Sequence, residues 1–267
     1  MKTQPVVLIS GGSRGIGKAA AQIFIDKGCV VYEVSRSGKD DTAIKHLDGD
    51  VTDPEAMKAA VEKVMAAEGQ LNILVANAGY GVAGPLEYTS QADMRNQFEV
   101  NVFGTVNLIQ AALPALRASG GGRIILTSSM AAITSIPFQA LYSASKAAVN
   151  QIALALNNEL KPFNITCTAM MPGDIATAFP DNRDIEIPTN TPYGDVPKKS
   201  VAKMASDERN GTDPRKLASR IVDLAMAKRT PKPLIGYGFD YRFLLGLVKL
   251  APARFMNYCV YQLYCRF

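Results

Sequence analysis

Residues 6–17 read VVLISGGSRGIG, and this stretch decides the fold. It starts as a short apolar run typical of a buried strand and continues as a glycine-rich turn that leads directly into a helical pattern over residues 15–27. Glycine lets the backbone approach a phosphate group closely, and the first N–H groups of a helix carry partial positive charge. The stretch therefore predicts a strand, a phosphate-binding turn and a helix.

The alternation of apolar runs and helical patterns continues along the chain. We expect strands over residues 29–35, 71–76, 123–128, 165–170 and 234–236, helices over 54–68, 100–117, 142–160 and 214–228, and an irregular stretch between 177 and 214. Strands that are apolar on both faces and joined by helices form parallel sheets covered on both sides. The predicted fold class is α/β, a Rossmann-type doubly wound parallel sheet with helices on both faces.

Length and composition fit a single domain. The 267 residues are 48% hydrophobic and 20% charged, which is typical of a globular chain with one large core. We expect a catalytic domain over residues 1–238, with a substrate lid over 178–213, and a helical extension over 239–267. Because no apolar run is long enough to span a membrane, we expect a cytoplasmic protein. The four cysteines lack metal-ligand spacing, so neither a metal site nor a disulfide is expected.

The net charge of +5 comes from the end of the chain. Residues 228–267 hold seven Lys or Arg residues against one acid, Asp240. This distribution argues against a nucleic-acid partner, which would require a basic stripe across the body. Residues 239–250 and 253–267 look like two amphipathic helices, and such a basic end could lie on a membrane surface, cover the active site or form a subunit contact. These alternatives stay open, and we expect a homodimer or homotetramer.

The glycine spacing carries a family resemblance. Gly11, Gly15 and Gly17 are arranged as Gly-x-x-x-Gly-x-Gly, and later stretches read NAG at residues 77–79 and PGDIAT at residues 172–177. In this order they resemble the short-chain dehydrogenase/reductase family over residues 6–177. Ser10 stands where the family carries Thr, which keeps the hydroxyl group. The resemblance implies an oxidoreductase with a nicotinamide cofactor.

Tyr142 and Lys146 are the candidate catalytic pair. Four positions apart on one helix, they project from the same face, and a nearby cation makes a phenol easier to ionise. A Tyr–Lys pair alone is also typical of an amphipathic surface. The resemblance adds Ser129, thirteen residues before Tyr142, to hold the substrate oxygen, and Asn101 to hold a water in the proton relay. It implies that Tyr142 protonates the oxygen of a carbonyl group whose carbon receives a hydride.

Charge predicts the choice of cofactor. NAD sites place a carboxylate at the end of the second strand, where this chain has Ser35 and Arg36, and Arg14 adds a second cation. We therefore expect NADP(H), with Glu33 turned from the phosphate. Asp50 resembles the family's adenine-contacting acid but equally suits a loop before the next helix. The expected cofactor-binding residues are Gly11, Ser13, Arg14, Gly15, Ile16, Gly17, Arg36, Ser37, Asp50, Val51, Asn77, Ala78, Gly79, Tyr142, Lys146, Pro172, Gly173, Ile175 and Thr177.

We expect a bulky, apolar carbonyl or alcohol substrate. The side chains expected around it are Ser129, Tyr80, Ile136, Phe138, Tyr142 and Phe179. A large apolar pocket without a fixed cation suits a steroid, retinoid or acyl-chain ketone. The tail loosely resembles the 17β-hydroxysteroid dehydrogenase branch, so a steroid ketone and a role in lipid metabolism are favoured. The only histidine, His46, is expected to be structural and to lack a triad partner.

Other functions remain open at this point. Among enzymes they are a 3-oxoacyl carrier-protein reductase and a reductase of acyl-dihydroxyacetone phosphate or retinal. Outside enzymes they are a cofactor-sensing protein and a membrane-associated scaffold protein.

Overall fold

The computed structural model describes residues 4–39, 43–238, 246 and 250–267. Seven parallel strands form its main sheet in the order β3-β2-β1-β4-β6-β7-β9. Their bounds are β1 Val6–Ser10, β2 Val30–Ser35, β3 Ile44–Asp48, β4 Ile73–Ala76, β6 Gly122–Thr127, β7 Ile165–Pro172 and β9 Leu234–Tyr237. Because the order reverses between β1 and β4, the predicted doubly wound sheet is confirmed.

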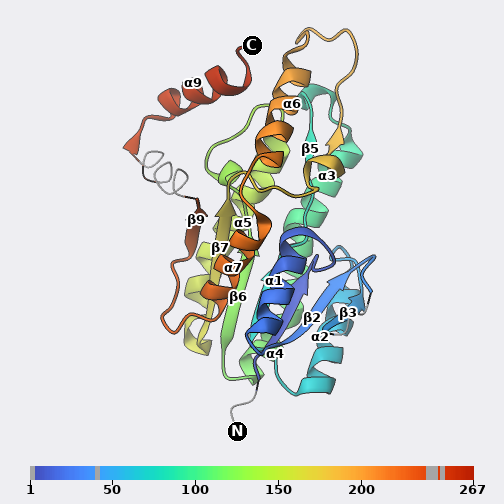
Figure 1. Cartoon of the computed structure of the whole chain (residues 1–267), viewed down its shortest axis with the longest axis vertical. Helices are drawn as coiled ribbons and strands as arrows, with labels where there is room; N and C mark the ends of the chain where they lie inside the picture. Colours follow the sequence, from blue (N-terminus) through green and yellow to red (C-terminus); the bar gives the residue numbers. More distant parts are fainter. Residues whose placement is uncertain (1–3, 40–42, 239–245, 247–249) are drawn as a thin grey trace.

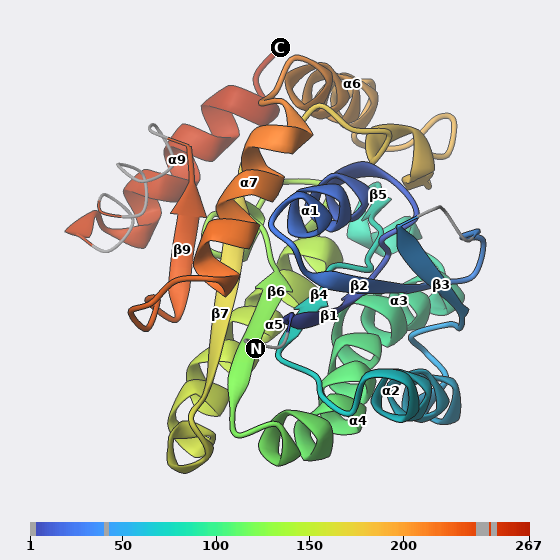
Figure 2. The same cartoon turned by 60° about the horizontal axis from the view of Figure 1, so that its bottom comes forward.

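Helices cover both faces of this sheet (Figures 1 and 2). One face carries α1 (Gly15–Asp26) and α7 (Pro214–Ala225), and the other carries α2 (Pro54–Glu68), α4 (Gly104–Ala118) and α5 (Ala140–Glu159). Val7 and Ile9 of β1 pack into the core under α1 and α7, whereas Leu8 between them packs into the opposite core. A strand that is buried on both faces must be apolar at every position, which explains the unbroken run in the sequence.

The predicted helix over residues 54–68 is confirmed as α2. Asp53 caps its start by accepting from the backbone N–H groups of Glu55 and Ala56 at 2.9 and 3.2 Å. The helix predicted at residue 100 starts earlier, because α3 (Gln91–Phe98) continues through a π-helical turn, η2 (Glu99–Phe103), into α4. The polar sequence of α3 has almost no apolar periodicity, so its helical pattern was too weak to predict.

The prediction of an irregular stretch between residues 177 and 214 is wrong. This segment contains η5 (Pro180–Asn182), β8 (Asp184–Ile185) and α6 (Val196–Arg209). β8 pairs in parallel with β5 (Val82–Ala83), which ties the segment to the body of the domain. α6 buries only a narrow stripe, so its sequence shows little helical pattern. The remaining short helices are η1 Leu86–Tyr88, η3 Met130–Ala132 and η4 Lys161–Phe163.

The second of the two predicted tail helices is present as α9 (Ala253–Tyr264). It lies at the same end of the molecule as α6 (Figure 1), and Lys203 Nζ of α6 sits 5.7 Å from the centre of the Tyr264 ring. The predicted helix over residues 239–250 lies largely outside the described residues. Among those that are described, no helix is long and apolar enough to cross a membrane.

Candidate active site

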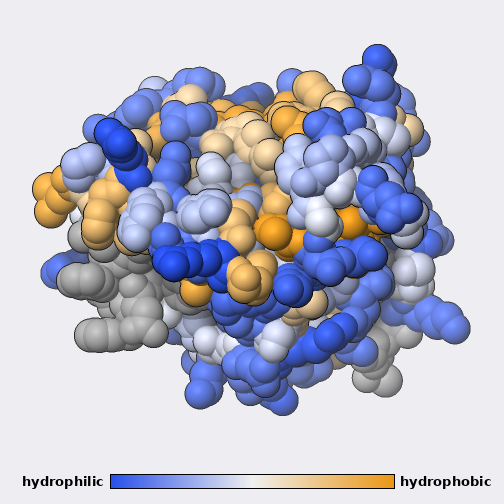
Figure 3. Space-filling model, turned by 90° about the horizontal axis from the view of Figure 1, so that it is seen from above, coloured by the Kyte–Doolittle hydropathy of each residue, from blue (hydrophilic) through white to orange (hydrophobic). Residues whose placement is uncertain are grey.

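The carboxyl ends of the strands open into a cavity of about 1130 Å³. It extends from the glycine turn between β1 and α1 to α6 and α9, and Figure 3 looks onto this end of the molecule. Apolar side chains gather across the middle of that face and polar ones border them. A cavity of this size at the switch point of a doubly wound sheet has room for a dinucleotide and a second ligand.

The glycine turn has the geometry of a phosphate site. Gly11 has a φ of 66°, a conformation that side chains rarely adopt. Gly17 brings α1 against the end of β1, since a Cβ there would collide with the carbonyl oxygen of Gly11. No side chain caps the start of α1, and its first turn holds no acid. The N-terminal N–H groups of α1 and its positive dipole end therefore suit a phosphate group.

Asn77, in the cavity lining, joins the ends of β1, β4 and β6. Ser10 Oγ accepts from the backbone N–H groups of Asn77 and Ala78 at 3.1 and 3.2 Å. The Asn77 amide donates to the Gly11 carbonyl at 3.1 Å and accepts from Thr127 Oγ1 at 3.3 Å. The hydroxyl group that Ser10 keeps thus joins the end of β1 to the turn after β4. These contacts give the NAG stretch a structural role beside the cavity.

Two arginines and one aspartate lie in the part of the cavity next to the end of β2. Arg36 is exposed and lies 3.7 Å from Asp50, which shapes its own turn by accepting from Thr52. Arg14 donates to Asn182 at 3.1 Å. Both arginines line the cavity. Glu33 does not line it, because its buried carboxylate bonds to His46 instead.

Among the described residues, the carboxylates of Glu33 and Asp48 contact His46. Its Nδ1 contacts Glu33 and its Nε2 lies 3.0 Å from Asp48. Burial lowers the pKa of His46, but the hydrogen bonds to Asp48 and Glu33 outweigh this and raise it above its usual value. His46 lies outside the cavity lining, and its contact with Glu33 joins β3 to β2.

Tyr142 and Lys146 occupy successive turns of α5 and both line the cavity. Lys146 Nζ donates to the Thr127 carbonyl at 2.8 Å and lies 5.9 Å from the centre of the Tyr142 ring. Burial raises the pKa of Tyr142 to about 12, opposed by a hydrogen bond with Ser129. Burial also lowers the pKa of Lys146 to about 8. Lys146 is not among the groups that act on the pKa of Tyr142, so the expected lowering by the lysine is not found. Tyr142 is therefore protonated at neutral pH, as a proton donor must be.

Asn101 lies behind the cavity wall rather than in it. It sits in the π-helical turn η2, where its Oδ1 accepts from the Tyr80 backbone N–H at 3.0 Å. Its Nδ2 donates to the Tyr80 carbonyl and to Ser145 Oγ at 3.0 and 3.1 Å. A Cβ on Gly79 would lie 3.0 Å from Asn101 Oδ1 and 3.4 Å from Lys146 Nζ. Only the bare backbone of Gly79 thus separates the asparagine from the lysine.

Most of the predicted site residues line the cavity. Of the expected cofactor residues only Gly17 does not, and of the expected substrate residues only Phe138 does not. Phe138 has a φ of 61° and packs edge-on against Tyr193, with ring centres 6.2 Å apart. That packing turns its ring toward the small core between Ala83 and α6.

The expectation of a pocket without a fixed cation is wrong. Arg183, only 6% exposed, lines the cavity and pairs through Nη2 with Glu208 Oε1 at 2.6 Å. The guanidinium lies 5.5 Å from the centre of the Phe179 ring, which in turn lies 5.7 Å from that of Tyr142. Burial raises the pKa of Glu208 despite the opposing effect of Arg183. No motif spacing links these two residues, because the fold of the lid segment brings them together.

The tail helix borders the same cavity. Its contributions are Met256, Cys259, Val260, Leu263 and Tyr264. Of the three arrangements that the sequence left open for the tail, covering the active site is the one with which these positions agree.

Comparisons with known proteins agree with this geometry. A family model described as short chain dehydrogenase matches residues 5–186. The chain is 38% identical over 229 residues to a 3-ketodihydrosphingosine reductase of Bacteroides thetaiotaomicron, covering 85% of each protein. It is 34% identical over 191 residues to human 17-beta-hydroxysteroid dehydrogenase type 1, covering 65% of this chain and 58% of that protein. A solved short-chain dehydrogenase from Streptomyces avermitilis superposes with a TM-score of 0.81 at 28% identity, covering 97% of both chains.

Proposed function

This chain belongs to the short-chain dehydrogenase/reductase family of oxidoreductases, and we propose that it uses NADPH to reduce the keto group of a long-chain lipid. The single observation that carries this proposal is the half-buried Tyr142 in the cavity lining, with Ser129 hydrogen-bonded to it and Lys146 Nζ 5.9 Å from the centre of its ring. A proton donor at this place is what carbonyl reduction requires.

The residues present fit a nicotinamide dinucleotide. The uncapped start of α1 and the glycine turn suit its pyrophosphate, and Asn77, Gly79 and Thr177 line the path toward Tyr142. Lys146 Nζ, in the same cavity wall, suits the nicotinamide ribose. When bound, the reduced cofactor supplies a hydride to the carbonyl carbon.

The chain's own residues supply position and the proton. The Ser129 hydroxyl and the Tyr142 Oη hold the carbonyl oxygen, and the Tyr142 proton passes to that oxygen as the carbon is reduced. The product is a secondary alcohol, and Tyr142 is left as a phenolate. The Lys146 ammonium, near the tyrosine ring, stabilises that charge until a proton returns from solvent.

NADP(H) is the proposed cofactor because of the charges at the end of β2. Ser35 leaves no carboxylate to repel a 2′-phosphate, and Glu33 is engaged by His46. Arg36 and Arg14 both line this part of the cavity, and guanidinium groups match phosphate oxygens in geometry.

A long-chain lipid ketone fits the mixed character of the cavity. Apolar side chains from α9 and the lid segment suit a hydrocarbon chain, while Arg183 and Glu208 suit a polar group near the ketone. The relation to a 3-ketodihydrosphingosine reductase supports this substrate class. A steroid ketone, the class favoured by the sequence, is the second candidate, which the relation to 17-beta-hydroxysteroid dehydrogenase type 1 favours.

A screen of NADPH oxidation tests the proposal. The substrates are a long-chain 2-amino-3-ketone, a 3-oxoacyl thioester, a 17-ketosteroid, retinal and a small ketone, each repeated with NADH. We expect the highest kcat/KM for the long-chain ketone and a preference for NADPH. Oxidation of neither cofactor with any carbonyl compound would refute the proposed reductase, and a higher kcat/KM for the steroid would select the second candidate.

We also propose a peripheral membrane contact through the outer face of α9 and a homodimeric or homotetrameric assembly. Phe255, Tyr258 and Tyr261 are 51%, 57% and 54% exposed on successive turns of that helix. Flotation with anionic liposomes tests the first point, because a triple substitution of these rings by Ser should abolish binding. Light scattering measures the assembly directly.

A further inference from the structure

Arg183 and Glu208 form a buried ion pair that leaves hydrogen-bonding capacity unused. Their side chains are 1% and 19% exposed. Within the described part of the chain, Arg183 Nη1 and Glu208 Oε2 have no hydrogen-bond partner. The Gln139 amide is oriented with its oxygen toward Arg183, and this oxygen accepts from Arg183 Nε and Nη2 at 2.9 and 3.1 Å. A buried donor and acceptor left without partners are costly, so their presence at a cavity wall points to a ligand.

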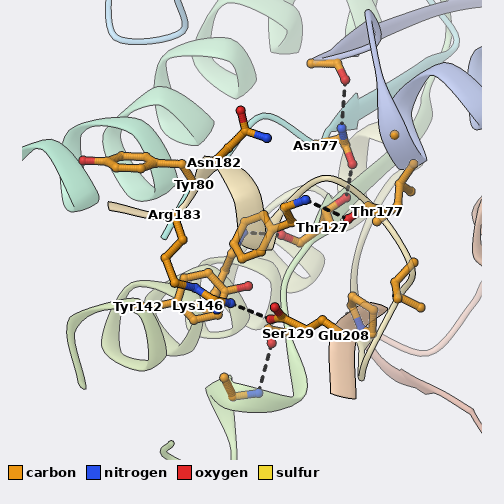
Figure 4. A pocket seen from close by; sticks show the side chains of 18 of the residues that line it. Asn77, Tyr80, Thr127, Ser129, Tyr142, Lys146, Thr177, Asn182, Arg183 and Glu208 are labelled. Carbon is orange, nitrogen blue, oxygen red and sulfur yellow. Dashed lines mark hydrogen bonds and ion pairs between the residues drawn. The ribbon is translucent and has the colours of Figure 1, made fainter. Parts of the chain in front are cut away.

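The pair and the proton donor share an aromatic neighbour. The ring of Phe179 has its centre 5.5 Å from the Arg183 guanidinium and 5.7 Å from the centre of the Tyr142 ring. Figure 4 shows Arg183 and Glu208 joined in the same part of the cavity as Tyr142. The charges of Glu208 and Arg183 also act on the pKa of Tyr142, so a polar group on the same ligand as the reacting ketone can reach the pair.

The two unused atoms select the kind of polar group. Glu208 Oε2 can only accept and Arg183 Nη1 can only donate, so the pair suits a ligand that offers a donor and an acceptor side by side. A carboxylate oxygen accepts most strongly from a charged donor, which favours an ammonium group, whereas a phosphate or carboxylate head has no donor to offer it.

We propose that Arg183 and Glu208 bind the head of an amino-alcohol ketone. Glu208 Oε2 accepts from the ammonium group, and Arg183 Nη1 donates to the neighbouring hydroxyl oxygen. This proposal rests on the proposed function and specifies the substrate class of the same site. The acyl chain then extends from the ketone toward the apolar residues of α9.

A purely structural role is the competing explanation, because the pair also joins the start of β8 to α6. The chain offers a matched control for that role. Arg209 of α6 pairs with Asp181 of η5 at 2.8 Å, but both side chains are well exposed, at 61% and 59%. Arg209→Gln therefore breaks a link between η5 and α6 without touching the buried pair.

Calorimetric titration tests the proposal independently of turnover. The ligands are a soluble medium-chain 2-amino-1,3-diol, its analogue without the amine, and a diol phosphate of equal chain length without the amine. We expect wild type to bind the amino-diol at least about tenfold more tightly than either analogue, since charge-assisted hydrogen bonds are lost in both. Glu208→Gln should remove this preference, and Arg209→Gln should keep it.

Equal affinity of wild type for the amino-diol and its deaminated analogue would overturn the subsite, and so would tighter binding of the phosphate. This comparison needs no variant, so it stands even where Glu208→Gln folds poorly. Reduction rates for the ketones that correspond to the amino-diol and to its deaminated analogue test the subsite and the reductase activity separately. Reduction of both ketones with equal kcat/KM refutes the subsite and leaves the reductase intact, whereas selective binding of the amino-diol without reduction of any ketone refutes the reductase.

Discussion

Lys146 Nζ lies 5.9 Å from the centre of the Tyr142 ring, one turn further along α5. Burial shifts the pKa values of the two groups in opposite directions, since it raises that of Tyr142 to about 12 and lowers that of Lys146 to about 8. At neutral pH the phenol therefore keeps its proton while the ammonium is still charged. This is the protonation state in which a carbonyl can be reduced.

Lys146→Met should change how stability depends on pH. The folded pKa of Lys146 lies below its usual value of 10.5, so between these values the unfolded chain binds more protons and stability rises with pH. Relative to Lys146→Met, wild type should gain about 2 kcal/mol between pH 7.5 and 9.5. Urea unfolding of both proteins measures this difference, and parallel curves would show that the lysine pKa is not lowered.

His46→Gln should show the opposite dependence. The pKa of His46 is raised in the folded state, so its contribution to stability is fully present below pH 6.5 and is lost as the pH rises through the folded pKa. We expect this variant to be more destabilised at pH 5.5 than at pH 8.5. Thermal unfolding of wild type and variant at pH 5.5 and 8.5 tests this expectation. A larger loss of stability at pH 8.5 would contradict it.

Asn101→Ala should destabilise the fold by about 3 kcal/mol, because it leaves both backbone groups of Tyr80 and the Ser145 hydroxyl without this partner. Asn107→Ala is the matched control. Asn107 is half-buried and donates one hydrogen bond, to the Val51 carbonyl at 3.0 Å. Asn107→Ala should therefore lower the free energy of unfolding by about 1 kcal/mol. Equal losses in chemical denaturation would contradict the assigned role of Asn101 in holding Tyr80.

Arg36→Gln should weaken NADPH binding selectively. Removing a phosphate-binding guanidinium should raise the KM for NADPH about tenfold while leaving that for NADH unchanged. Arg117→Gln removes the same charge at the far end of α4, outside the cavity lining, and should alter neither value. An equal effect of Arg36→Gln on both cofactors would mean that Arg36 does not contact the 2′-phosphate.

The local parts of the site could be predicted from sequence because their geometry is set within a few residues. The turn at residues 11–17 and the spacing of Tyr142 and Lys146 depend only on one turn and one helix. The same holds for α2, whose Asp53 cap precedes Pro54 directly. In each case the neighbours in the chain are also the neighbours in space.

The remaining parts depend on packing between distant segments. Arg183 and Glu208 are 25 positions apart and meet only because β8 pairs with β5 and α6 folds back. The pKa of Tyr142 follows mainly from burial, and the lysine that the spacing places nearby does not lower it. Phe138 was expected at the substrate, but its positive φ and its contact with Tyr193 direct it elsewhere.

We propose that Tyr142 supplies the proton when the ketone is reduced by NADPH. Tyr142→Phe removes only the phenolic oxygen, so the fold and the glycine turn should be unaffected. The decisive measurement pairs NADPH affinity, from calorimetric titration, with the rate of NADPH oxidation on the long-chain ketone. We predict unchanged affinity and a loss of at least about a hundredfold in kcat. Near-normal turnover by this variant would show that a group other than Tyr142 supplies the proton.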